Sequence, residues 1–596
     1  MNIVSNLTLS NTINNTIKCT VILVLLTQLK NESLFNFIKS YIDIPKTYIP
    51  LLQNIEDNIK TNNLSMASLT LDYNNSIINN KNKQSKKTRK SKSTRKSKST
   101  RKSKSTRKSK STRKSKSTRK SKSTRKIINC INDTDNNTDN NTNTNNIHQI
   151  FIIPINNKSY NKTNNDELLE LSRVSGNAIY NRLKNNQISK VNIINTLDTI
   201  SGDSTFIEAI MEGLLLSSYR FLKYKTEDSL TKNKDKFKIQ NIHLVLPLYK
   251  REIHKDKTIK NIKHLINEIK SVFLTRDLIN NPANDGKADL FIDTVKKYIK
   301  ENKIPITLKV IDKNKLHKMG MGLILGVGKA SSKINEPKVL ILKYKGNIKY
   351  KTIPEYFLLG KGITYDTGGT NLKRGSSMYE MKTDMSGAAI IISFLLGYAM
   401  NNGSKSIYAM CPLVENSIGS SAIKPSDVLT SYSGKTVEVS NTDAEGRLIL
   451  ADCLAYVSDK YPTASIIDFA TLTGQQESLS CKMFSNILSS NSDSDVAKLI
   501  EKGKHINEPL VELPMMDKHL NKLESYVADI TNVSFSCSAD IIMSSLFMKQ
   551  FINKNTKWIH IDIAGSSYKV NEIIKYASPE ASGVGVRLLF SFFEDK

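Results

Sequence analysis

The segment that decides the fold is residues 356–373, which read YFLLGKGITYDTGGTNLK. Its first five residues are mainly apolar and end at Gly360, which is typical of a buried β-strand. Lys361, Asp366 and Lys373 then follow among glycines, which let the backbone turn tightly. In an open α/β sheet, binding sites form in the loops at the carboxyl ends of the strands. The segment therefore predicts a functional loop that follows a strand of such a sheet.

Outward from this segment, short apolar runs alternate with helical patterns over the second half of the chain. The predicted strands are 306–311, 339–344, 356–360, 406–413, 436–439, 465–469 and 558–563. Continuous apolar runs of this length are typical of strands in a sheet that is covered on both faces. We expect a parallel or mixed sheet here, and an α/β fold in two domains, with a mixed central sheet in the C-terminal one.

A long helical pattern separates this region from the first part of the chain. Apolar residues recur at helical spacing from Ile259 to Phe273, and the pattern ends at Asn280-Asn281-Pro282. Earlier strands and helices also alternate, which favours an α/β domain. The predicted elements before the long helix are 150–155, 167–183, 191–194, 206–216 and 243–248. The predicted parts are an N-terminal domain over 1–248, a linking helix over 249–280 and a second domain over 281–596.

The sequence favours a reducing compartment and predicts no membrane span. The apolar run 20–26 is too short to cross a bilayer, and we interpret it as a first β-strand. A noncleaved or organelle-targeting leader is the alternative. Six scattered cysteines without a CxxC pair are typical of small buried residues in a reduced protein. We therefore predict a cytoplasmic location.

Much of the net charge of this 596-residue chain, +33, lies in one segment. Residues 86–126 contain 22 lysines and arginines and no acidic residue, so the remainder carries only about +11. The hexapeptide KSKSTR repeats six times over 90–125, and 132–146 contains nothing but Asn, Asp and Thr. Neither stretch has apolar residues to bury, so neither offsets the entropy lost on ordering. We predict a disordered insertion over 83–147.

The insertion has two interpretations. The sequence favours an expanded repeat that is tolerated in a surface loop. The alternative is an arm that binds RNA, DNA or another polyanion with an affinity that falls as salt rises. A gel shift that disappears on deletion of 83–147 would support the arm.

A second segment, 439–448, reads VSNTDAEGRL and lies between a predicted strand and a predicted helix at about 446–457. Asp443, Glu445 and Arg447 alternate along it. In an extended loop, residues i and i+2 point the same way, so both carboxylates are expected to face one pocket. Together with the first segment and Asp384, this gives four carboxylates, two lysines and one arginine.

This set of charges suits hydrolysis of a carbonyl compound. Carboxylate oxygens bind divalent cations, and four carboxylates balance the charge of two. A water molecule bridged by two such ions loses a proton near neutral pH and becomes a nucleophile. Lys373 and Arg447 would stabilise the oxyanion that forms on attack. The simpler interpretation is a set of ordinary loop ion pairs. The sequence contains no GxSxG, HExxH or GxxxxGK[ST] motif, and His560 is predicted to be a core histidine.

At these residues the chain resembles the leucyl aminopeptidase family, the cytosol aminopeptidases. The octapeptide NTDAEGRL at 441–448 looks like the family signature, and GKGITYDTGG at 360–369 is similar to its first metal loop. The spacing from Lys361 through Asp366 and Lys373 to Asp384 also matches. Further similar segments are NPAN at 281–284, DFATLTG at 468–474, HIDIAG at 560–565 and GVGVR at 583–587. The resemblance covers about 275–596.

The resemblance implies a metal-dependent exopeptidase that removes an N-terminal residue, leucine or another apolar one, from peptides. One ion, Zn or Mn, would be held by Lys361, Asp366, Asp384 and Glu445. The second would be held by Asp366, Asp443 and Glu445, and Lys361 must lose its proton to ligate.

The resemblance also implies roles for the neighbouring residues and an assembly. Lys373 would polarise the scissile carbonyl, and Arg447 would hold a bicarbonate ion that acts as general base. Met381 and Leu472 would contact the substrate, although Met381 is nearly as well explained as a core residue. A homohexamer is expected.

Two segments depart from the family pattern. Residues 475–480 and 534–542 are more polar than the family's small and apolar stretches, which puts side-chain preference and assembly in question. Ser386 stands where the family usually has glycine, and we expect little effect. Two other classes stay open: a nucleic-acid-binding protein that acts through 83–147, and an inactive scaffold, which the complete set of ligand residues disfavours.

Overall fold

The computed structural model describes residues 6–10, 19–25, 67–72, 147–155, 165–195, 204–232, 236–245, 253–346 and 353–594. The predicted insertion at 83–147 lies outside these residues up to 146. Residue 147 is an exception, because it already belongs to a β-strand.

The first part of the described chain forms a six-stranded, mostly parallel sheet in the order β1-β6-β5-β2-β4-β3. Only β3 at one edge runs antiparallel to its neighbour. The run predicted as a first strand is β2, which lies inside the sheet. The strands are β1 (Asn6–Ser10), β2 (Cys19–Leu25), β3 (Ala67–Asp72), β4 (Ile147–Ile155), β5 (Lys190–Asn195) and β6 (Asn241–Val245).

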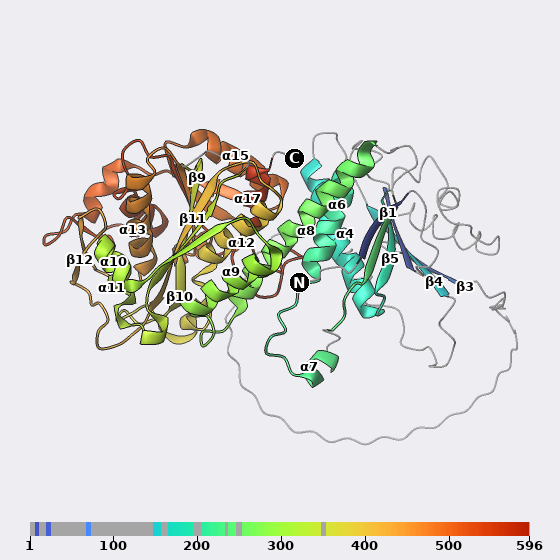
Figure 1. Ribbon diagram of the computed structural model, residues 1–596, viewed down its shortest axis with the longest axis horizontal. Coiled ribbons are helices and arrows are strands. Elements are labelled where there is room, and N and C mark those ends of the chain that lie inside the picture. Colours follow the sequence, from blue (N-terminus) through green and yellow to red (C-terminus); the bar gives the residue numbers. More distant parts are fainter. Residues whose placement is uncertain are drawn as a thin grey trace, which may run out of the picture.

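Helices lie between this sheet and the second part of the molecule (Figure 1). The long predicted helix is present as α8 (Ile253–Asn280) and ends one residue before Asn281-Pro282. Its Arg276 donates to the carbonyl of Leu216, 3.0 Å away, and to that of Ser582, 2.9 Å away. The layer also contains α4 (Asn165–Asn185) and α6 (Thr205–Ser217), while the short α7 (Glu227–Lys232) lies apart from it, at the bottom of the view in Figure 1. The two parts of the molecule therefore share α8 as a common packing element.

The second part contains a nine-stranded mixed sheet in the order β16-β15-β18-β14-β9-β11-β8-β7, with β10 paired to β11. This confirms the predicted α/β class and the mixed central sheet. Its strands are β7 (Thr307–Ile311), β8 (Lys338–Tyr344), β9 (Tyr356–Gly360), β10 (Gly362–Asp366), β11 (Ile407–Asn416), β14 (Ser465–Ala470), β15 (Ser485–Ser490), β16 (Leu510–Glu512) and β18 (Trp558–Asp562). A separate small sheet contains β12 (Val428–Thr430), β13 (Thr436–Glu438) and β17 (Ile530–Thr531).

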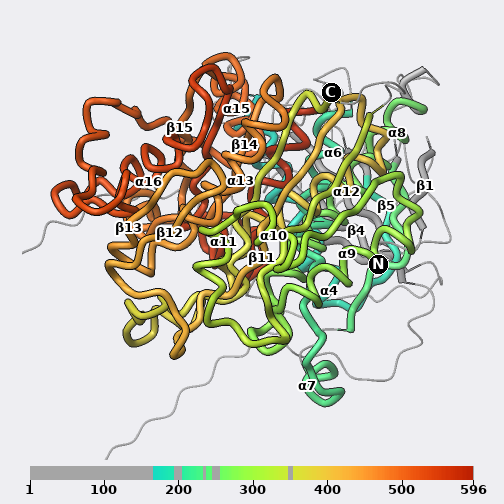
Figure 2. Tube along the Cα trace, turned by 60° about the vertical axis from the view of Figure 1, so that its left-hand side comes forward, coloured from blue at the N-terminus to red at the C-terminus, as the bar shows by residue number. Residues whose placement is uncertain are grey.

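Helices cover both faces of the mixed sheet and bury one apolar cluster on each. One cluster includes α12, which is apolar all round, as expected for a fully buried helix. The other includes α13 and α16, which lie side by side (Figure 2). The helices of this part are α9 (Ala288–Asn302), α10 (Lys313–Met319), α11 (Gly322–Val327), α12 (Ser386–Met400), α13 (Glu445–Lys460), α14 (Gly474–Ser480), α15 (Asp493–His505), α16 (Asp540–Lys549) and α17 (Val586–Phe593).

One run among the described residues, Gly375–Met400, has the length and the mean hydropathy, 1.4, of a membrane-spanning segment. It contains α12, and 94% of the apolar window is buried inside the protein. It is therefore accounted for as a core helix of the mixed sheet.

The architecture brings several strand ends to one place. Strands β9, β10, β11, β14 and β18 run parallel to one another. Their carboxyl ends therefore share one edge of the sheet, where the loops of an α/β fold form binding sites. Lys361 directly follows β9, Asp366 ends β10 and Thr471 directly follows β14.

Candidate metal centre

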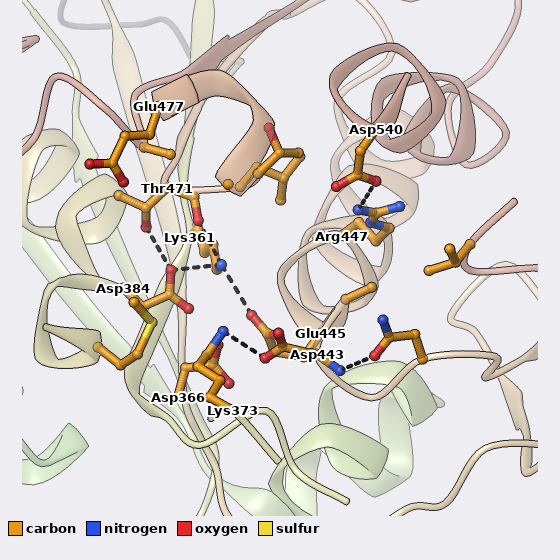
Figure 3. Close-up of a pocket in the computed structure, with 18 of the residues that line it drawn as sticks. Lys361, Asp366, Lys373, Asp384, Asp443, Glu445, Arg447, Thr471, Glu477 and Asp540 are labelled. Carbon is orange, nitrogen blue, oxygen red and sulfur yellow. Dashed lines mark hydrogen bonds and ion pairs between the residues drawn. The ribbon is translucent and has the colours of Figure 1, made fainter. Parts of the chain in front are cut away.

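A cavity of about 430 Å³ opens at this edge of the sheet. It is lined by all the residues that the sequence singled out for the site, which are Lys361, Asp366, Lys373, Met381, Asp384, Asp443, Glu445, Arg447 and Leu472. Figure 3 shows the lysines and carboxylates gathered at one end, with Arg447 apart from them. The structure thus places the predicted residues together, while their individual roles stay predictions.

Lys361 is buried among oxygen atoms. Its Nζ lies 2.7 Å from Oδ1 of Asp384 and 3.0 Å from Oε1 of Glu445, and it donates to the carbonyl of Thr471 at 2.8 Å. Burial works against the charged form, but the surrounding carboxylates outweigh burial and raise the pKa of Lys361. These carboxylates hold Lys361 as an ammonium ion. A divalent cation bound by its nitrogen would therefore have to displace a proton.

Lys373 bridges the other two carboxylates. Its Nζ lies 2.9 Å from Oδ2 of Asp366 and 2.6 Å from Oδ1 of Asp443. Burial opposes its charge, yet Asp366 and Asp443 raise the pKa of Lys373 above its usual value. The side chain is 14% exposed, compared with 3% for Lys361. Lys373 is therefore a permanent cation that retains access to the cavity.

The carboxylates fit a divalent cation. One oxygen each from Asp366, Asp443 and Glu445 lies within 4.8 Å of the others. Oδ2 of Asp384 and Oε2 of Glu445 are buried and have no hydrogen-bond partner. Burial and the nearby Glu445 raise the pKa of Asp366 to about 7, a sign of closely packed negative charge. Converging oxygens with unused lone pairs are the environment that hard divalent ions prefer.

Neighbouring polar side chains that the sequence did not single out hold these carboxylates in place. Asn416, at the end of β11, donates to Oδ1 of Asp366 at 2.8 Å and to the carbonyl of Thr442 at 3.1 Å. The hydroxyl of Thr471 donates to Oδ1 of Asp384 at 2.8 Å. Asn416 and Thr471 both lie where a parallel strand ends. A polar residue at the end of a predicted strand could therefore have been recognised from the sequence as a candidate site residue.

The reason given for pairing Asp443 with Glu445 was wrong, although both residues line the cavity. The segment is not extended there: Asp443 lies in a turn and Glu445 is the first residue of α13. The turn is fixed by Thr442, whose hydroxyl donates to the carbonyl of Gly368 at 2.6 Å. The two carboxylates converge because a turn leads directly into a helix.

Gly446 makes room for Lys361. A Cβ atom at this position would lie 2.4 Å from Cε and 2.7 Å from Nζ of Lys361, closer than real contacts allow. We expect Gly446→Ala to push the Lys361 nitrogen away from Glu445 and to weaken metal binding by about 10–100-fold, as for other changes that misplace a ligand. Titration with Zn²⁺ in a calorimeter checks this. Gly434→Ala is the control, because a Cβ there meets nothing, although its positive φ costs some stability. An unchanged affinity in Gly446→Ala would contradict the expectation.

Arg447 already has a carboxylate bound to it. Its Nη2 lies 2.7 Å from Oδ1 of Asp540, and its Nη1 donates to the carbonyl of Asn532 at 3.1 Å. The arginine side chain is only 3% exposed. A bicarbonate ion on this guanidinium would meet the negative charge of Asp540. The Nε of Arg447 is buried and has no hydrogen-bond partner, so the guanidinium keeps one unused donor, and the bicarbonate ion stays a prediction.

The two segments that depart from the family pattern contact each other. Gln475, in α14, donates from Nε2 to the carbonyl of Ser538 at 2.9 Å, and its Oε1 accepts from the amide of Ile541 at 3.2 Å. Gln476 donates to the carbonyl of Phe484 at 2.8 Å. The polar character of 475–480 is thus explained in part by hydrogen bonds that fix the start of α16.

His560 is the core histidine that the sequence predicted. It is fully buried in β18, and its Nδ1 lies 2.7 Å from Oδ1 of Asp468, while Trp558 donates to the other oxygen at 2.7 Å. Of the cysteines, the four that the structure describes in full, Cys411, Cys453, Cys481 and Cys537, are free.

Comparison with known proteins shows which family this chain resembles. Residues 273–590 match the catalytic domain of the cytosol aminopeptidase family. A probable cytosol aminopeptidase of Rickettsia canadensis is 34% identical over 409 residues, which cover 68% of this chain and 77% of the relative. One of Wolbachia pipientis wMel is 36% identical over 423 residues, which cover 70% and 79%.

A solved structure has the same fold. The bottromycin maturation enzyme BotP in complex with Mn matches with a TM-score of 0.65 at 23% identity, covering 75% of this chain and 90% of that one. At this identity the match supports the architecture alone. The family match, the relatives and the carboxylate cavity together lead to one conclusion: this chain belongs to the cytosol aminopeptidase family and is a peptidase, a hydrolase of peptide bonds.

Proposed function

We propose that this metal-dependent aminopeptidase removes N-terminal residues from peptides with the help of two divalent ions held in the cavity. The observation that carries the proposal is the convergence of Asp366, Asp443 and Glu445 within 4.8 Å, next to two lysines that are themselves held by carboxylates. An isolated acidic cluster is common in proteins, but this one lies in a chain of the aminopeptidase family.

The ligand sets follow from the resemblance and are compatible with the geometry. One ion would be held by Lys361, Asp366, Asp384 and Glu445, and the other by Asp366, Asp443 and Glu445. Zn²⁺ and Mn²⁺ both suit nitrogen and carboxylate ligands. When bound, such ions supply Lewis acidity and a water molecule of lowered pKa. The partnerless oxygens of Asp384 and Glu445 support this assignment.

Lys373 is proposed to stabilise negative charge on the substrate. Its ammonium group is fixed between Asp366 and Asp443 and still reaches the cavity. As water adds to the scissile carbonyl, charge develops on the carbonyl oxygen. A cation already held in position stabilises that charge without first having to reorganise. Lys373 is therefore assigned to the carbonyl oxygen of the substrate.

The preference for leucine or another apolar first residue is proposed on Met381 and Leu472, which line the cavity. Leu472 is also fixed through its amide, which donates to Oδ1 of Asp562 at 3.2 Å. The cavity also contains Glu380 and Glu477, each paired with a lysine, Lys569 and Lys482 respectively. The two charges of each pair cancel, so these residues add no net charge to the cavity wall. An uncharged substrate side chain therefore suits the cavity best.

We also propose a homohexamer in the cytoplasm. Tyr526 and Phe535 are almost fully exposed, and exposed aromatic side chains suit a contact between subunits. The cytoplasmic location rests on the names of the relatives. Sedimentation velocity tests the assembly: a monomer at micromolar concentration would contradict it.

The function is tested by turnover of an aminoacyl amide panel. The full chain is stripped with a chelator and reconstituted with Zn²⁺, Mn²⁺, Co²⁺ or Mg²⁺. We expect no turnover with the chelator, turnover with one or more metals, and the highest kcat/KM on leucine or methionine amide. N-acetyl-leucine amide, which lacks a free amino group, is the control and is expected to stay intact. Turnover of the acetylated compound, or inactivity with every metal, would contradict the proposal.

A further inference from the structure

An ion pair that the sequence did not single out lies in the wall of the cavity. Nζ of Lys482 lies 3.2 Å from Oε1 of Glu477, and both residues line the cavity. Glu477 belongs to the segment 475–480, which departs from the family pattern. The other pair at the cavity differs, because Glu380 lines it while its partner Lys569 lies outside the lining. A group inside the cavity therefore meets both charges of the Glu477–Lys482 pair.

The carboxylate of this pair is presented from a fixed helix. Helix α14 begins two residues after Leu472, which is proposed to contact the substrate. Its Gln476 is fully buried, and the side-chain amide of this residue is hydrogen-bonded through both its nitrogen and its oxygen. These bonds anchor the helix immediately before Glu477. Figure 3 shows Glu477 and Arg447 on opposite sides of Lys361.

The lysine of the pair is held from a second direction. Lys482 also approaches the carbonyl oxygen of Tyr568, which is 3.5 Å from its Nζ. The next residue, Lys569, pairs with Glu380, and Glu380 directly precedes Met381. Both ion pairs and the two residues proposed to contact the substrate side chain therefore lie in one part of the cavity wall.

The turn after α14 brings the two charges together. Cys481 and Lys482 have positive φ angles of 47° and 66°, in the left-handed region that residues other than glycine rarely adopt. The amide of Cys481 donates to the carbonyl of Glu477 at 3.0 Å, and the amide of Lys482 donates to Oγ of Ser480 at 3.2 Å. The chain thus reverses within two residues, and the lysine returns to the carboxylate five positions before it.

Charged substrate side chains compete with this pair, whereas uncharged ones do not. A substrate ammonium group would have to displace Lys482 from Glu477, and a substrate carboxylate would have to displace Glu477 from Lys482. Each resident partner is tethered to the chain, which gives it a high effective concentration. Glu477 is 52% exposed and Lys482 is 27% exposed, so water reaches both charges until a substrate side chain displaces it. A charge that loses both its partner and its water costs free energy.

We propose that the Glu477–Lys482 pair determines which N-terminal residues this enzyme accepts, by excluding side chains that carry a net charge. This rests on the aminopeptidase function proposed above and names the residues behind its preference for an uncharged side chain. Selectivity of this kind comes from a penalty on the wrong substrate. Loss of either partner leaves the other as an unpaired charge in the cavity wall. The enzyme then favours a substrate side chain of the opposite charge.

The first test replaces Lys482 by methionine, which keeps a long side chain and removes the charge. The full chain, loaded with the metal that gives the highest turnover, is assayed on lysine amide and on norleucine amide. Norleucine has the four-carbon stem of lysine without the ammonium group. We expect the ratio of kcat/KM for lysine amide to that for norleucine amide to rise about 10-fold or more in Lys482→Met, as for a close ion pair between enzyme and ligand.

The second test removes the other charge and should shift selectivity the opposite way. Glu477→Gln is expected to raise kcat/KM for glutamate amide relative to glutamine amide, which has the same shape and no charge. The double variant Glu477→Gln/Lys482→Met leaves neither charge unpaired. Both ratios should return towards those of wild type, because the effects of two residues in contact are not additive. A cavity that had only been enlarged would keep the gain on lysine amide.

The matched control is Lys313→Met. Lys313 pairs with Glu336 at 2.9 Å and lies outside the cavity lining, so both ratios should equal those of wild type. The melting temperature of every variant is measured on the same samples. The gain of Lys482→Met on lysine amide should also shrink as the NaCl concentration is raised, because salt screens charges that are accessible to solvent. If Lys482→Met does not fold, Glu477→Gln carries the same test with the opposite charge.

Three results would overturn the proposal. The first is a wild-type enzyme that hydrolyses lysine amide as readily as norleucine amide. The second is an unchanged ratio in a folded single variant. The third is a gain on lysine amide that the double variant retains. A wild-type chain that is inactive on every amide with every metal would instead contradict the proposed function, and the selectivity would fall with it.

Discussion

Replacement of Glu445 by alanine is expected to abolish hydrolysis and leave the protein folded. Glu445 contributes an oxygen to the convergent carboxylates and has a second buried oxygen with no partner. Loss of an outer-shell partner of a metal site costs about 10–100-fold, so loss of this carboxylate is expected to lower kcat/KM by about 1,000-fold or more. Turnover of leucine amide at saturating Zn²⁺, with metal content measured on the same sample, checks this.

The control for this variant is Glu355→Ala. Glu355 also pairs with a lysine, Lys405, at 3.0 Å, but it precedes β9 and so lies at the opposite end of the strand from Lys361. Its kcat/KM should match that of wild type. Full activity in a metal-replete Glu445→Ala variant would contradict the metal centre, as would a crystal with bound metal in which the carboxylates point away from the ions.

Replacement of Glu212 by glutamine is expected to cause a large loss of stability. Glu212, in α6, bonds to the buried guanidinium groups of Arg173 and Arg587. These three side chains are each less than a tenth exposed. Removal of this negative charge leaves the two buried arginines with fewer carboxylates to balance their positive charge. Breaking a buried ion pair in this way costs about 3–5 kcal/mol of stability. Urea unfolding at pH 7 measures the loss.

The pH dependence of this loss is also predicted. Burial alone would raise the pKa of Glu212, but Arg587 and Arg173 outweigh burial and lower it to about 2. Because this pKa lies below the value near 4.5 in an unfolded chain, the stabilisation is fully present above about pH 4.5 and is lost as pH falls towards 2. The difference in stability between wild type and Glu212→Gln should therefore shrink over that range.

The matched control is Glu227→Gln, which removes the charge from an exposed pair with Lys236. Exposed ion pairs contribute about 0–1 kcal/mol, so little change in stability is expected. Equal losses of unfolding free energy in the two variants would show that the buried ion pairs of Glu212 contribute no more to stability than an exposed ion pair.

Much of the fold could be predicted from the sequence because its strands are short apolar runs. Strand β9 begins and ends where the pattern placed it, and α8 ends next to the proline that limits it. Strand β10 was missed because Gly362–Asp366 contains glycine and polar residues, and it forms a strand through its pairing with β11. Tertiary pairing of this kind leaves little trace in a local pattern.

The candidate site was predictable where residue type and spacing carry the chemistry, as in Asp366 and Glu445. The ion pair between Arg447 and Asp540 was not predictable, because the two residues lie 93 positions apart in sequence. The insertion at 83–147 and the domain boundaries at 248 and 280 stay predictions. We retain the division into 1–248, 249–280 and 281–596 as a proposal.

The placement of α8 has a practical consequence for work with this protein. The hydroxyl of Thr275 reaches the carbonyl of Ala389 in α12 at 3.4 Å, while Arg276 reaches back to α6. A recombinant fragment that starts at residue 281 would lack this helix and expose one apolar side of α12 to solvent. Such a fragment should aggregate during expression. Truncations meant for crystallisation therefore need to begin before Ile253.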